Sequence, residues 1–190
     1  MRLVEIPKMQ SFIFIGYRGT GKTTVARKLA ECLGIPAFDS DSEIERRTGK
    51  NIAEIFAQDG EQVFRDWEES VITEILAGTN PLVLATGGGA ILRISTRERL
   101  RHSGRVIWLT ATPGTILRRI TNDAASKTMR PNLTSLPLYE EIVTVLEQRK
   151  SLYAETAHDI IETDFQTIDE IVAHVMLPIG SATDKAHKTV

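Results

Sequence analysis

Residues 16–24 read GYRGTGKTT, and their spacing Gly-x4-Gly-Lys-Thr is that of a phosphate-binding loop, or P-loop. The glycines allow backbone angles through which successive N–H groups surround a phosphate. Lys22 can reach the β- and γ-phosphates, and the Thr23 hydroxyl can ligate Mg²⁺. A glycine-rich turn that binds nothing is the alternative, but the complete match favours a nucleoside triphosphate site. Its candidate contacts are Gly19, Thr20, Gly21, Lys22, Thr23 and Thr24.

Two acidic residues follow a short apolar stretch at 35–38. A P-loop needs a carboxylate near its Mg²⁺, usually at the end of a neighbouring strand. Asp39 has this position, whereas the expected strands at 81–86 and 105–110 end in threonine. We therefore expect Asp39 to face the metal, directly or through water. Asp41 could accept a proton from a substrate hydroxyl. The alternative is that both only cap the next helix, which is worth about 1 kcal/mol; beside a P-loop, function is favoured.

Two arginines lie at informative positions on predicted helices. Arg149 falls on the apolar stripe of a helix expected at 138–153, so its guanidinium should point inward. A buried guanidinium needs a carboxylate or phosphate partner, unless its long stem lets it reach solvent at the core edge. Arg65 lies beside the apolar face of a helix expected at 61–76. From spacing alone, pairing with a glutamate three or four positions further on is the better interpretation.

A polar stretch and a glycine run complete the candidate chemistry. Residues 122–137 have no periodicity, and a connection of this length is usually a functional lid or a disordered loop. Arg130 in this stretch could close over phosphates, or it could be a solvated loop residue. Gly87, Gly88 and Gly89 end a predicted strand and offer a backbone surface that a substrate can approach closely. A flexible turn is the alternative interpretation.

The elements that must position these residues alternate along the chain. Short apolar stretches predict strands, and apolar residues at helical spacing predict helices between them. This alternation indicates an α/β fold with a parallel sheet covered on both faces, whose ligands gather at the carboxyl ends of the strands. Strands are expected at 12–15, 35–39, 81–86, 105–110 and 159–162. Helices are expected at 22–33, 41–48, 52–57, 61–76, 95–102, 113–120, 138–153 and 167–177.

Two local signals make further predictions. Ser40-x-x-Glu43 is a capping-box pattern, which predicts that Ser40 caps the helix at 41–48. Cys32 is the single cysteine, so an intramolecular disulfide is excluded, and we expect it to be a small core residue.

The composition is that of an ordinary globular protein, with 190 residues, 42% hydrophobic residues and a net charge of -2. We expect a single domain over 1–190, with its core at 11–177 and a polar tail at 178–190. No general basic charge favours nucleic acid, and no apolar run approaches the roughly 20 residues of a membrane span. We therefore expect a cytoplasmic protein that binds neither nucleic acid nor membrane. We also expect it to be a monomer.

Beyond the P-loop, the chain resembles the shikimate kinase family from Phe12 to Met176. The similarity rests on Asp39-Ser40-Asp41, Arg65-x-x-Glu68, 83–89, Arg130-Pro131 and Arg149-x-x-Leu152-Tyr153, in that family's order. It implies a nucleoside-monophosphate-kinase-like P-loop fold, with five parallel strands in the order 2-3-1-4-5. The chain would then be a single kinase domain over 1–190, with substrate-binding helices at 41–77 and a lid at 122–137. It also implies transfer of the γ-phosphoryl group of ATP, with Mg²⁺, to the 3-hydroxyl of shikimate, in chorismate and aromatic amino acid biosynthesis.

The resemblance also implies roles for individual residues. Asp41 would hold and activate the attacking hydroxyl, and Arg65 and Arg149 would clamp the shikimate carboxylate, with Gly88 also contacting the substrate. Arg130 would reach ATP from the lid. The other implied contacts are Arg119 and Gln166 to adenine, Lys22 to the phosphates, and Thr23 and Asp39 to Mg²⁺. The chain departs from the usual family pattern at Ser151, often proline, and at Asn132, often leucine.

Three other classes of P-loop protein are alternatives to this family. A kinase of another small acceptor, such as gluconate or a nucleoside monophosphate, would differ in the motifs between the P-loop and the lid. A GTPase switch should carry Asn-Lys-x-Asp for guanine, which the sequence lacks. A motor ATPase is disfavoured because no apolar strand ends in Asp-Glu.

Overall fold

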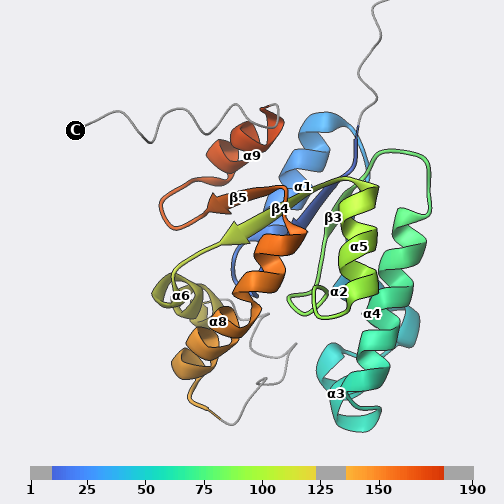
Figure 1. The fold of residues 1–190 in the computed structure, drawn as a ribbon, viewed down its shortest axis with the longest axis vertical. Helices are drawn as coiled ribbons and strands as arrows, with labels where there is room; N and C mark the ends of the chain where they lie inside the picture. The colour runs from blue at the N-terminus through green and yellow to red at the C-terminus, as the bar shows by residue number, and fades with distance from the viewer. Residues whose placement is uncertain (1–9, 123–135, 178–190) are drawn as a thin grey trace, which may run out of the picture.

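A five-stranded parallel sheet in the order β2-β3-β1-β4-β5 forms the centre of the molecule (Figure 1). The structure is a computed structural model, and it describes residues 10–122 and 136–177. The strands are β1 (Phe12–Ile15), β2 (Ala37–Asp39), β3 (Val83–Ala85), β4 (Arg105–Thr110) and β5 (Asp159–Glu162). The predicted fold class and strand order are both confirmed.

The predicted helices are present, and their ends lie within a few residues of the expected positions. They are α1 (Lys22–Leu33), α2 (Ser40–Thr48), α3 (Ile52–Gln58), α4 (Glu61–Leu76), α5 (Ile94–Ser103), α6 (Pro113–Asn122), α8 (Leu138–Thr156) and α9 (Ile168–Met176). Among these described helices, none is both long enough and apolar enough to cross a membrane.

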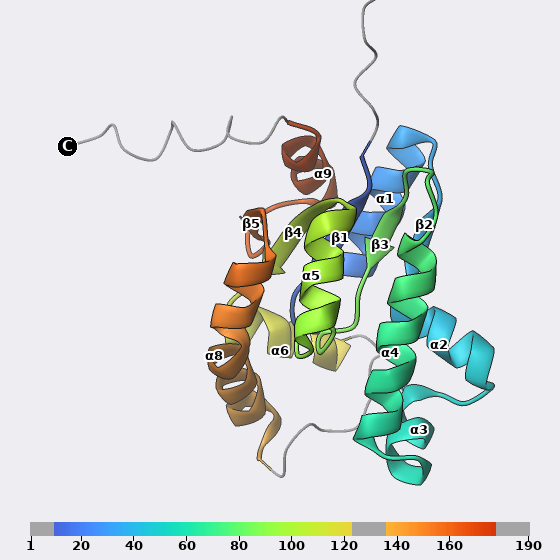
Figure 2. The ribbon, with the colours of Figure 1, turned by 45° about the vertical axis from the view of Figure 1, so that its right-hand side comes forward.

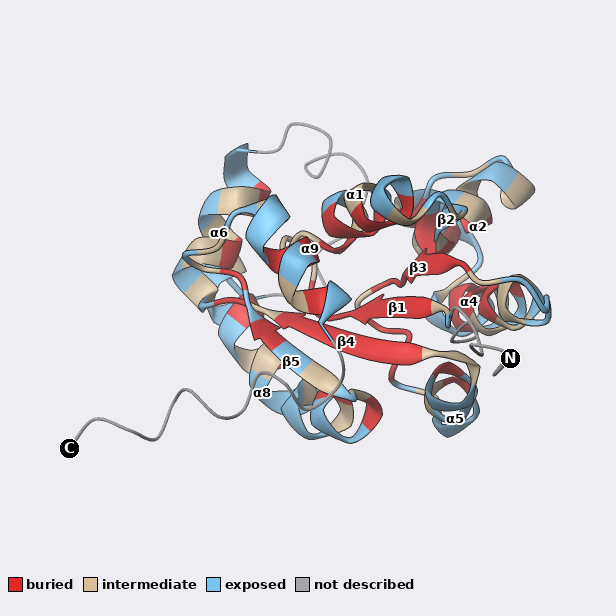
Figure 3. Ribbon diagram, turned by 90° about the horizontal axis from the view of Figure 1, so that it is seen from above, coloured by how far each residue is buried: buried red, intermediate tan, exposed pale blue. Residues whose placement is uncertain are grey.

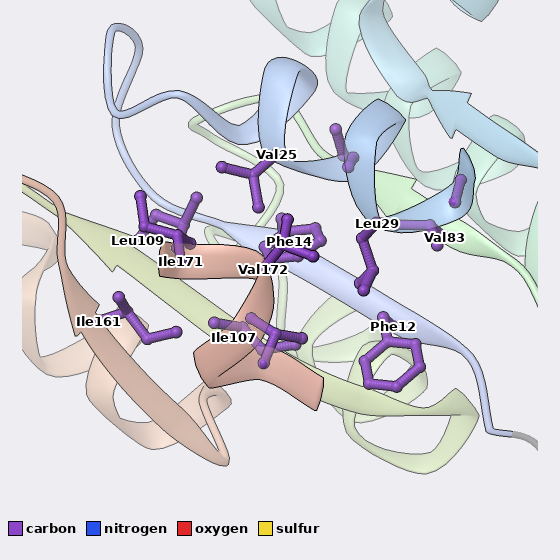
Figure 4. Close-up of a cluster of buried hydrophobic side chains, with 14 residues drawn as sticks. Phe12, Phe14, Val25, Leu29, Val83, Ile107, Leu109, Ile161, Ile171 and Val172 are labelled. Carbon is purple, nitrogen blue, oxygen red and sulfur yellow. The ribbon is translucent and has the colours of Figure 1, made fainter. Parts of the chain in front are cut away.

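Helices cover both faces of the sheet, as a parallel sheet requires (Figure 3). Because side chains alternate along a strand, β1 supplies residues to two separate core clusters. Phe12 and Phe14 pack with Val25 of α1 and Ile171 of α9 on one face (Figure 4). Ile13 and its neighbours on the other face pack against α4, α5 and α8. The strand that leads into the P-loop is therefore fixed from both sides.

Two smaller clusters lie beyond the carboxyl ends of the strands. One joins α2, α3 and α4 through residues such as Ile44, Ile55 and Phe64. The other joins α6 and α8 to the P-loop through Ile116 and Tyr17. Figure 2 shows these two groups of helices on opposite sides of the carboxyl edge of the sheet. They position side chains from distant parts of the sequence around the P-loop.

The prediction that Ser40 caps α2 was wrong. Asp39 is the N-cap, and its Oδ1 accepts the backbone N–H groups of Asp41 at 3.0 Å and Ser42 at 3.2 Å. Ser40 is instead fully buried, and its hydroxyl oxygen accepts the Gly87 N–H at 2.9 Å. The capping pattern was placed one residue too late because both Asp and Ser are good N-caps. The shift leaves Ser40 to tie α2 to the glycine turn after β3.

The prediction that Cys32 is a core residue was also wrong, since it is exposed. Cys32 follows Val25 by seven residues and Leu29 by three, so helical spacing places it near their buried side, but it lies in the last turn of α1, where Glu31 and Gly34 are also exposed. Gly34 ends the same helix at a φ of 66°, in the left-handed conformation that glycine favours.

Candidate active site

The P-loop connects β1 to α1 and is held in a conformation that requires glycine. Gly16 has a φ of 139°, and a Cβ atom there would collide with the carbonyl oxygen of Leu109. The Lys22 ammonium donates to the carbonyls of Gly16 and Tyr17, each at 2.8 Å. Its charge is therefore held against the loop and beside the N–H groups expected to bind phosphate.

Asp39 uses its two oxygens differently. Oδ1 caps α2, while Oδ2 accepts the Thr23 hydroxyl at 2.6 Å. The capping interpretation and the metal-site interpretation are thus compatible for this residue. A hydroxyl and a carboxylate at this spacing fit Mg²⁺, which takes oxygen ligands and commonly uses one or two carboxylates together with substrate phosphates. Within 10–122 and 136–177, no cluster of three or more His, Cys, Asp or Glu could hold a metal alone.

A large open cavity lies along the P-loop and extends to α6 and the residues after β5. Arg119 of α6 lines it, donating to the Thr163 carbonyl at 2.7 Å and the Gly19 carbonyl at 3.3 Å. Burial lowers the pKa of Arg119. Gln166 also lines this cavity, and its amide donates to the Glu162 carbonyl at 2.7 Å. Both residues that were predicted to contact adenine thus line this cavity.

A second, smaller cavity lies beside the first. It brings together side chains from α2, α4 and α8 and the backbone of the turn after β3. All the residues predicted to bind the acceptor line it, namely Asp41, Arg65, Gly87, Gly88, Gly89 and Arg149. The structure therefore gathers residues more than 100 positions apart into one pocket.

Arg65 forms the predicted ion pair on its own helix, but the pair is buried. Its Nη1 donates to Glu68 Oε2 at 2.7 Å, and its Nη2 lies 3.1 Å from Glu61 Oε1. The side chains of Arg65 and Glu68 are only 9% and 3% exposed. The guanidinium also lies 5.0 Å from the Phe64 ring centroid and 5.9 Å from that of Phe56. The predicted pairing of Arg65 with a glutamate three positions further on is confirmed, and the pair is buried because this face of α4 turns toward the cavity.

Glu68 is a site residue that the sequence-based site prediction missed. Burial raises the pKa of its carboxyl, and the Arg65 guanidinium opposes that rise. Its Oε1 has no hydrogen-bond partner among the residues that the structure describes. A Cβ atom on Gly87 would lie 2.5 Å from this oxygen and 2.6 Å from Asp41 Oδ1. The Arg-x-x-Glu spacing placed Glu68 beside Arg65, but nothing local indicated that the carboxylate faces the pocket.

Arg149 points toward the glycine turn rather than away from the core. Its Nη1 donates to the Gly88 carbonyl at 3.0 Å, and Tyr153 one turn later donates to the same oxygen at 2.6 Å. Tyr153 is fully buried against Trp108, with the ring centroids 5.3 Å apart, and burial raises its pKa to about 12. Two donors on one carbonyl fix the orientation of the Gly88 peptide. Because the Arg149 guanidinium makes this contact, it does not merely extend to solvent at the edge of the core.

The two cavities share a boundary. Among the described residues, Arg18, Asp41 and Ile52 line both of them. Asp41 lies in the first turn of α2 and is buried, with Oδ1 directed toward Gly87. A carboxylate between a phosphate-binding loop and an acceptor pocket can hold a hydroxyl and accept its proton. Arg130, Asn132 and nearly all of the predicted lid lie outside the described residues.

The sequence matches a known family over most of its length. The shikimate kinase family profile matches residues 18–179. A shikimate kinase of Rhodopirellula baltica is 38% identical over 179 residues, which cover 94% of this chain and 95% of the relative.

Solved structures give the same family. A shikimate kinase from Acinetobacter baumannii in complex with shikimate is 37% identical, with a TM-score of 0.81, covering 88% of this chain and 90% of that chain. A gluconokinase from Sinorhizobium meliloti is only 21% identical with a TM-score of 0.51, covering 87% and 89% respectively, and shares the fold alone. The family predicted from the motifs is confirmed: this chain belongs to the shikimate kinase family.

Proposed function

We propose that this protein transfers the γ-phosphoryl group of ATP to the 3-hydroxyl of shikimate, giving ADP and shikimate 3-phosphate. One observation carries the proposal: a P-loop cavity and a pocket with two arginines share the carboxylate of Asp41. The family relationship supports shikimate over gluconate, because the gluconokinase is similar in fold only.

On the nucleotide side, the P-loop N–H groups and Lys22 bind the phosphates. Thr23 and Asp39 hold Mg²⁺, whose charge neutralises the negative charge that develops on the phosphates. The Thr23–Asp39 contact at 2.6 Å supports this assignment. Arg119 and Gln166 contact the adenine, and Arg130 reaches ATP from the lid segment.

On the acceptor side, Arg65 and Arg149 bind the shikimate carboxylate, since a guanidinium matches a carboxylate with two parallel hydrogen bonds. The buried Glu68 holds Arg65 in place through the 2.7 Å ion pair. The turn at Gly87, Gly88 and Gly89 lets the hydroxylated cyclohexene ring of shikimate approach the backbone closely. Asp41 orients the attacking hydroxyl and accepts its proton, while the protein contributes mainly positioning and charge stabilisation.

We place this activity in a single kinase domain spanning 1–190, with its core at 11–177, substrate-binding helices at 41–77, a lid at 122–137 and a polar tail at 178–190. The active species is a cytoplasmic monomer in the pathway to chorismate.

The proposal is tested by measuring ADP release with shikimate, gluconate and nucleoside monophosphates as acceptors, each with ATP and with GTP. We expect kcat/KM for ATP and shikimate to exceed that of every other pair by at least ~10³-fold, the scale on which unpaired buried polar groups reject a wrong substrate. Equal or greater turnover with gluconate would overturn the proposed acceptor.

A further inference from the structure

Arg18 lies at the boundary between the two cavities, where the transferred group must pass. Of the three described residues that line both cavities, Asp41 is an anion, Ile52 is apolar and Arg18 is the one cation. We propose that the Arg18 guanidinium contacts the phosphoryl group during transfer and binds the phosphate of the product. This inference rests on the proposed function and adds to it a residue that the P-loop motif does not specify.

The position of Arg18 is fixed by a buried carboxylate. Its Nη2 donates to Oε1 of Glu141 on α8 at 2.8 Å, and the Tyr17 hydroxyl lies 3.3 Å from the same oxygen. The Glu141 side chain is 0% exposed and that of Arg18 is 12% exposed. Within the described residues, Arg18 Nε has no hydrogen-bond partner. The Glu141 carboxylate thus orients the guanidinium of a residue that lines both cavities.

The chemistry at this boundary calls for a cation. The bond from the γ-phosphorus to the bridging oxygen of ADP breaks, a bond to the acceptor oxygen forms, and the hydroxyl proton passes to Asp41. During this step negative charge is spread over three phosphoryl oxygens, which a planar guanidinium can contact through parallel N–H groups. Lys22 belongs to the nucleotide side and Arg65 to the acceptor side, whereas Arg18 lines both. The Arg18 guanidinium can therefore contact the phosphoryl group both before and after its transfer to the acceptor oxygen.

A competing explanation is that Arg18 only ties the P-loop to α8 through Glu141. Removing one partner of a buried ion pair is strongly destabilising, so a single substitution could act through the fold. The comparison therefore needs Arg18→Met, Arg18→Lys and the double variant Arg18→Met with Glu141→Gln, which removes both charges and leaves no unpaired buried ion. Arg46→Met is the matched control, since Arg46 is an exposed arginine outside both cavities.

The measurement is titration calorimetry of each variant with shikimate and with shikimate 3-phosphate, together with kcat at saturating substrates. We expect Arg18→Met to weaken product binding about 10- to 100-fold, the factor that a hydrogen bond to a charged group is worth. Shikimate binding should change less than about threefold, because that ligand lacks the phosphate. kcat should fall about 10²-fold, as for loss of one preorganised charge stabiliser, and the double variant should be equally slow. Arg18→Lys should recover only part of both effects.

Three results would overturn the inference while leaving the proposed function intact. The first is recovery of kcat and product affinity in the double variant, which would make Arg18 a structural tie. The second is an equal loss of affinity for shikimate and for its phosphate. The third is behaviour of Arg18→Met like that of Arg46→Met. If the wild-type protein itself fails to phosphorylate shikimate, the proposed function fails instead.

Discussion

At the scale of single residues, both arginines of the proposed acceptor pocket are held by neighbouring groups. Arg65 is held by Glu68, and Arg149 shares the Gly88 carbonyl with Tyr153. A charged side chain held in this way keeps one orientation. The substrate therefore binds without the entropy cost of ordering that side chain. Substitutions that keep size but change geometry are therefore the most informative.

Asp41→Asn keeps the shape of the side chain and removes its negative charge. We expect ATP binding to be unchanged and kcat to fall about 10²- to 10⁴-fold, because the hydroxyl loses its proton acceptor. Stopped-flow and steady-state ADP release, with ATP affinity measured by calorimetry, separate the two effects. Unchanged kcat with a lower melting temperature would instead mean that Asp41 only stabilises α2.

Arg149→Lys keeps the charge and replaces the planar fork with a point charge. The loss should weaken acceptor binding by about 1.5–3 kcal/mol, so that KM for shikimate rises about 10- to 100-fold while KM for ATP hardly changes. The check uses an acceptor that lacks the carboxylate. With that compound the wild type should lose most of its advantage, and an undiminished advantage would mean that Arg149 acts through packing.

Gly89→Ala tests whether the position of Arg65 matters for the acceptor. A Cβ atom at Gly89 would occupy the space of the Arg65 guanidinium, while the backbone there has no positive φ to prevent alanine. We expect KM for shikimate to rise about 10-fold or more, since the displaced guanidinium loses a charged hydrogen bond. Gly78→Ala, which would meet nothing within 4 Å, is the control and should behave as wild type. Equal kinetics for the two variants would contradict this role.

At the scale of elements, α2 carries Asp41, the carboxylate that we propose accepts the proton, and the helix is anchored at both ends. Asp39 and Ser40 tie its start to the P-loop threonine and the glycine turn, through the Thr23 and Gly87 contacts. Near its end, Arg47 donates to Glu43 of the same helix and to Glu74 of α4, each at 2.7 Å. The helix can therefore present its first turn to both cavities in one position.

Glu43→Gln should reveal the electrostatic part of that anchoring. Hydrogen bonds from Arg46 and Arg47 lower the pKa of Glu43 from 4.5 to about 2. A lowered native pKa stabilises the fold above the unfolded-state pKa, and this contribution disappears as pH falls from about 4.5 through about 2. The variant should lose at most about 1 kcal/mol at pH 7, because the pair is near the surface and screened by salt. Urea unfolding at pH 7 and pH 2.5 measures the difference, and an equal loss at both would contradict an ionic cause.

Elements were more predictable than the contacts between them. The periodicity of apolar residues predicted the helices, and Gly34 predicted the end of α1. The P-loop spacing predicted where β1 ends. The capping of α2 by Asp39 could not be separated from capping by Ser40, since the two residues are adjacent and both suit the position. The buried orientation of Arg65 depends on how α4 packs against α2 and α3, which spacing along one helix does not contain.

At the scale of the whole molecule, the sheet brings four distant segments to one edge. β1 is followed by the P-loop, β2 ends at Asp39, and β3 is followed by the glycine turn. The fourth segment is α8, whose Arg149 contacts that turn. The strand order 2-3-1-4-5 was implied by the family resemblance, because alternation of strands and helices predicts a parallel sheet but not its order. The pairing of Arg18 with Glu141 spans 123 positions, and no local pattern in the sequence indicates it.

The central claim is that the smaller cavity selects a carboxylate-bearing acceptor and presents its hydroxyl to the nucleotide cavity. The most direct test measures kcat/KM of the wild-type protein for shikimate and for the same ring with a hydroxymethyl group in place of the carboxylate. We predict a preference for shikimate of at least ~10²-fold, since two guanidinium groups would be left without their anion. Equal kcat/KM for the two compounds would contradict the account.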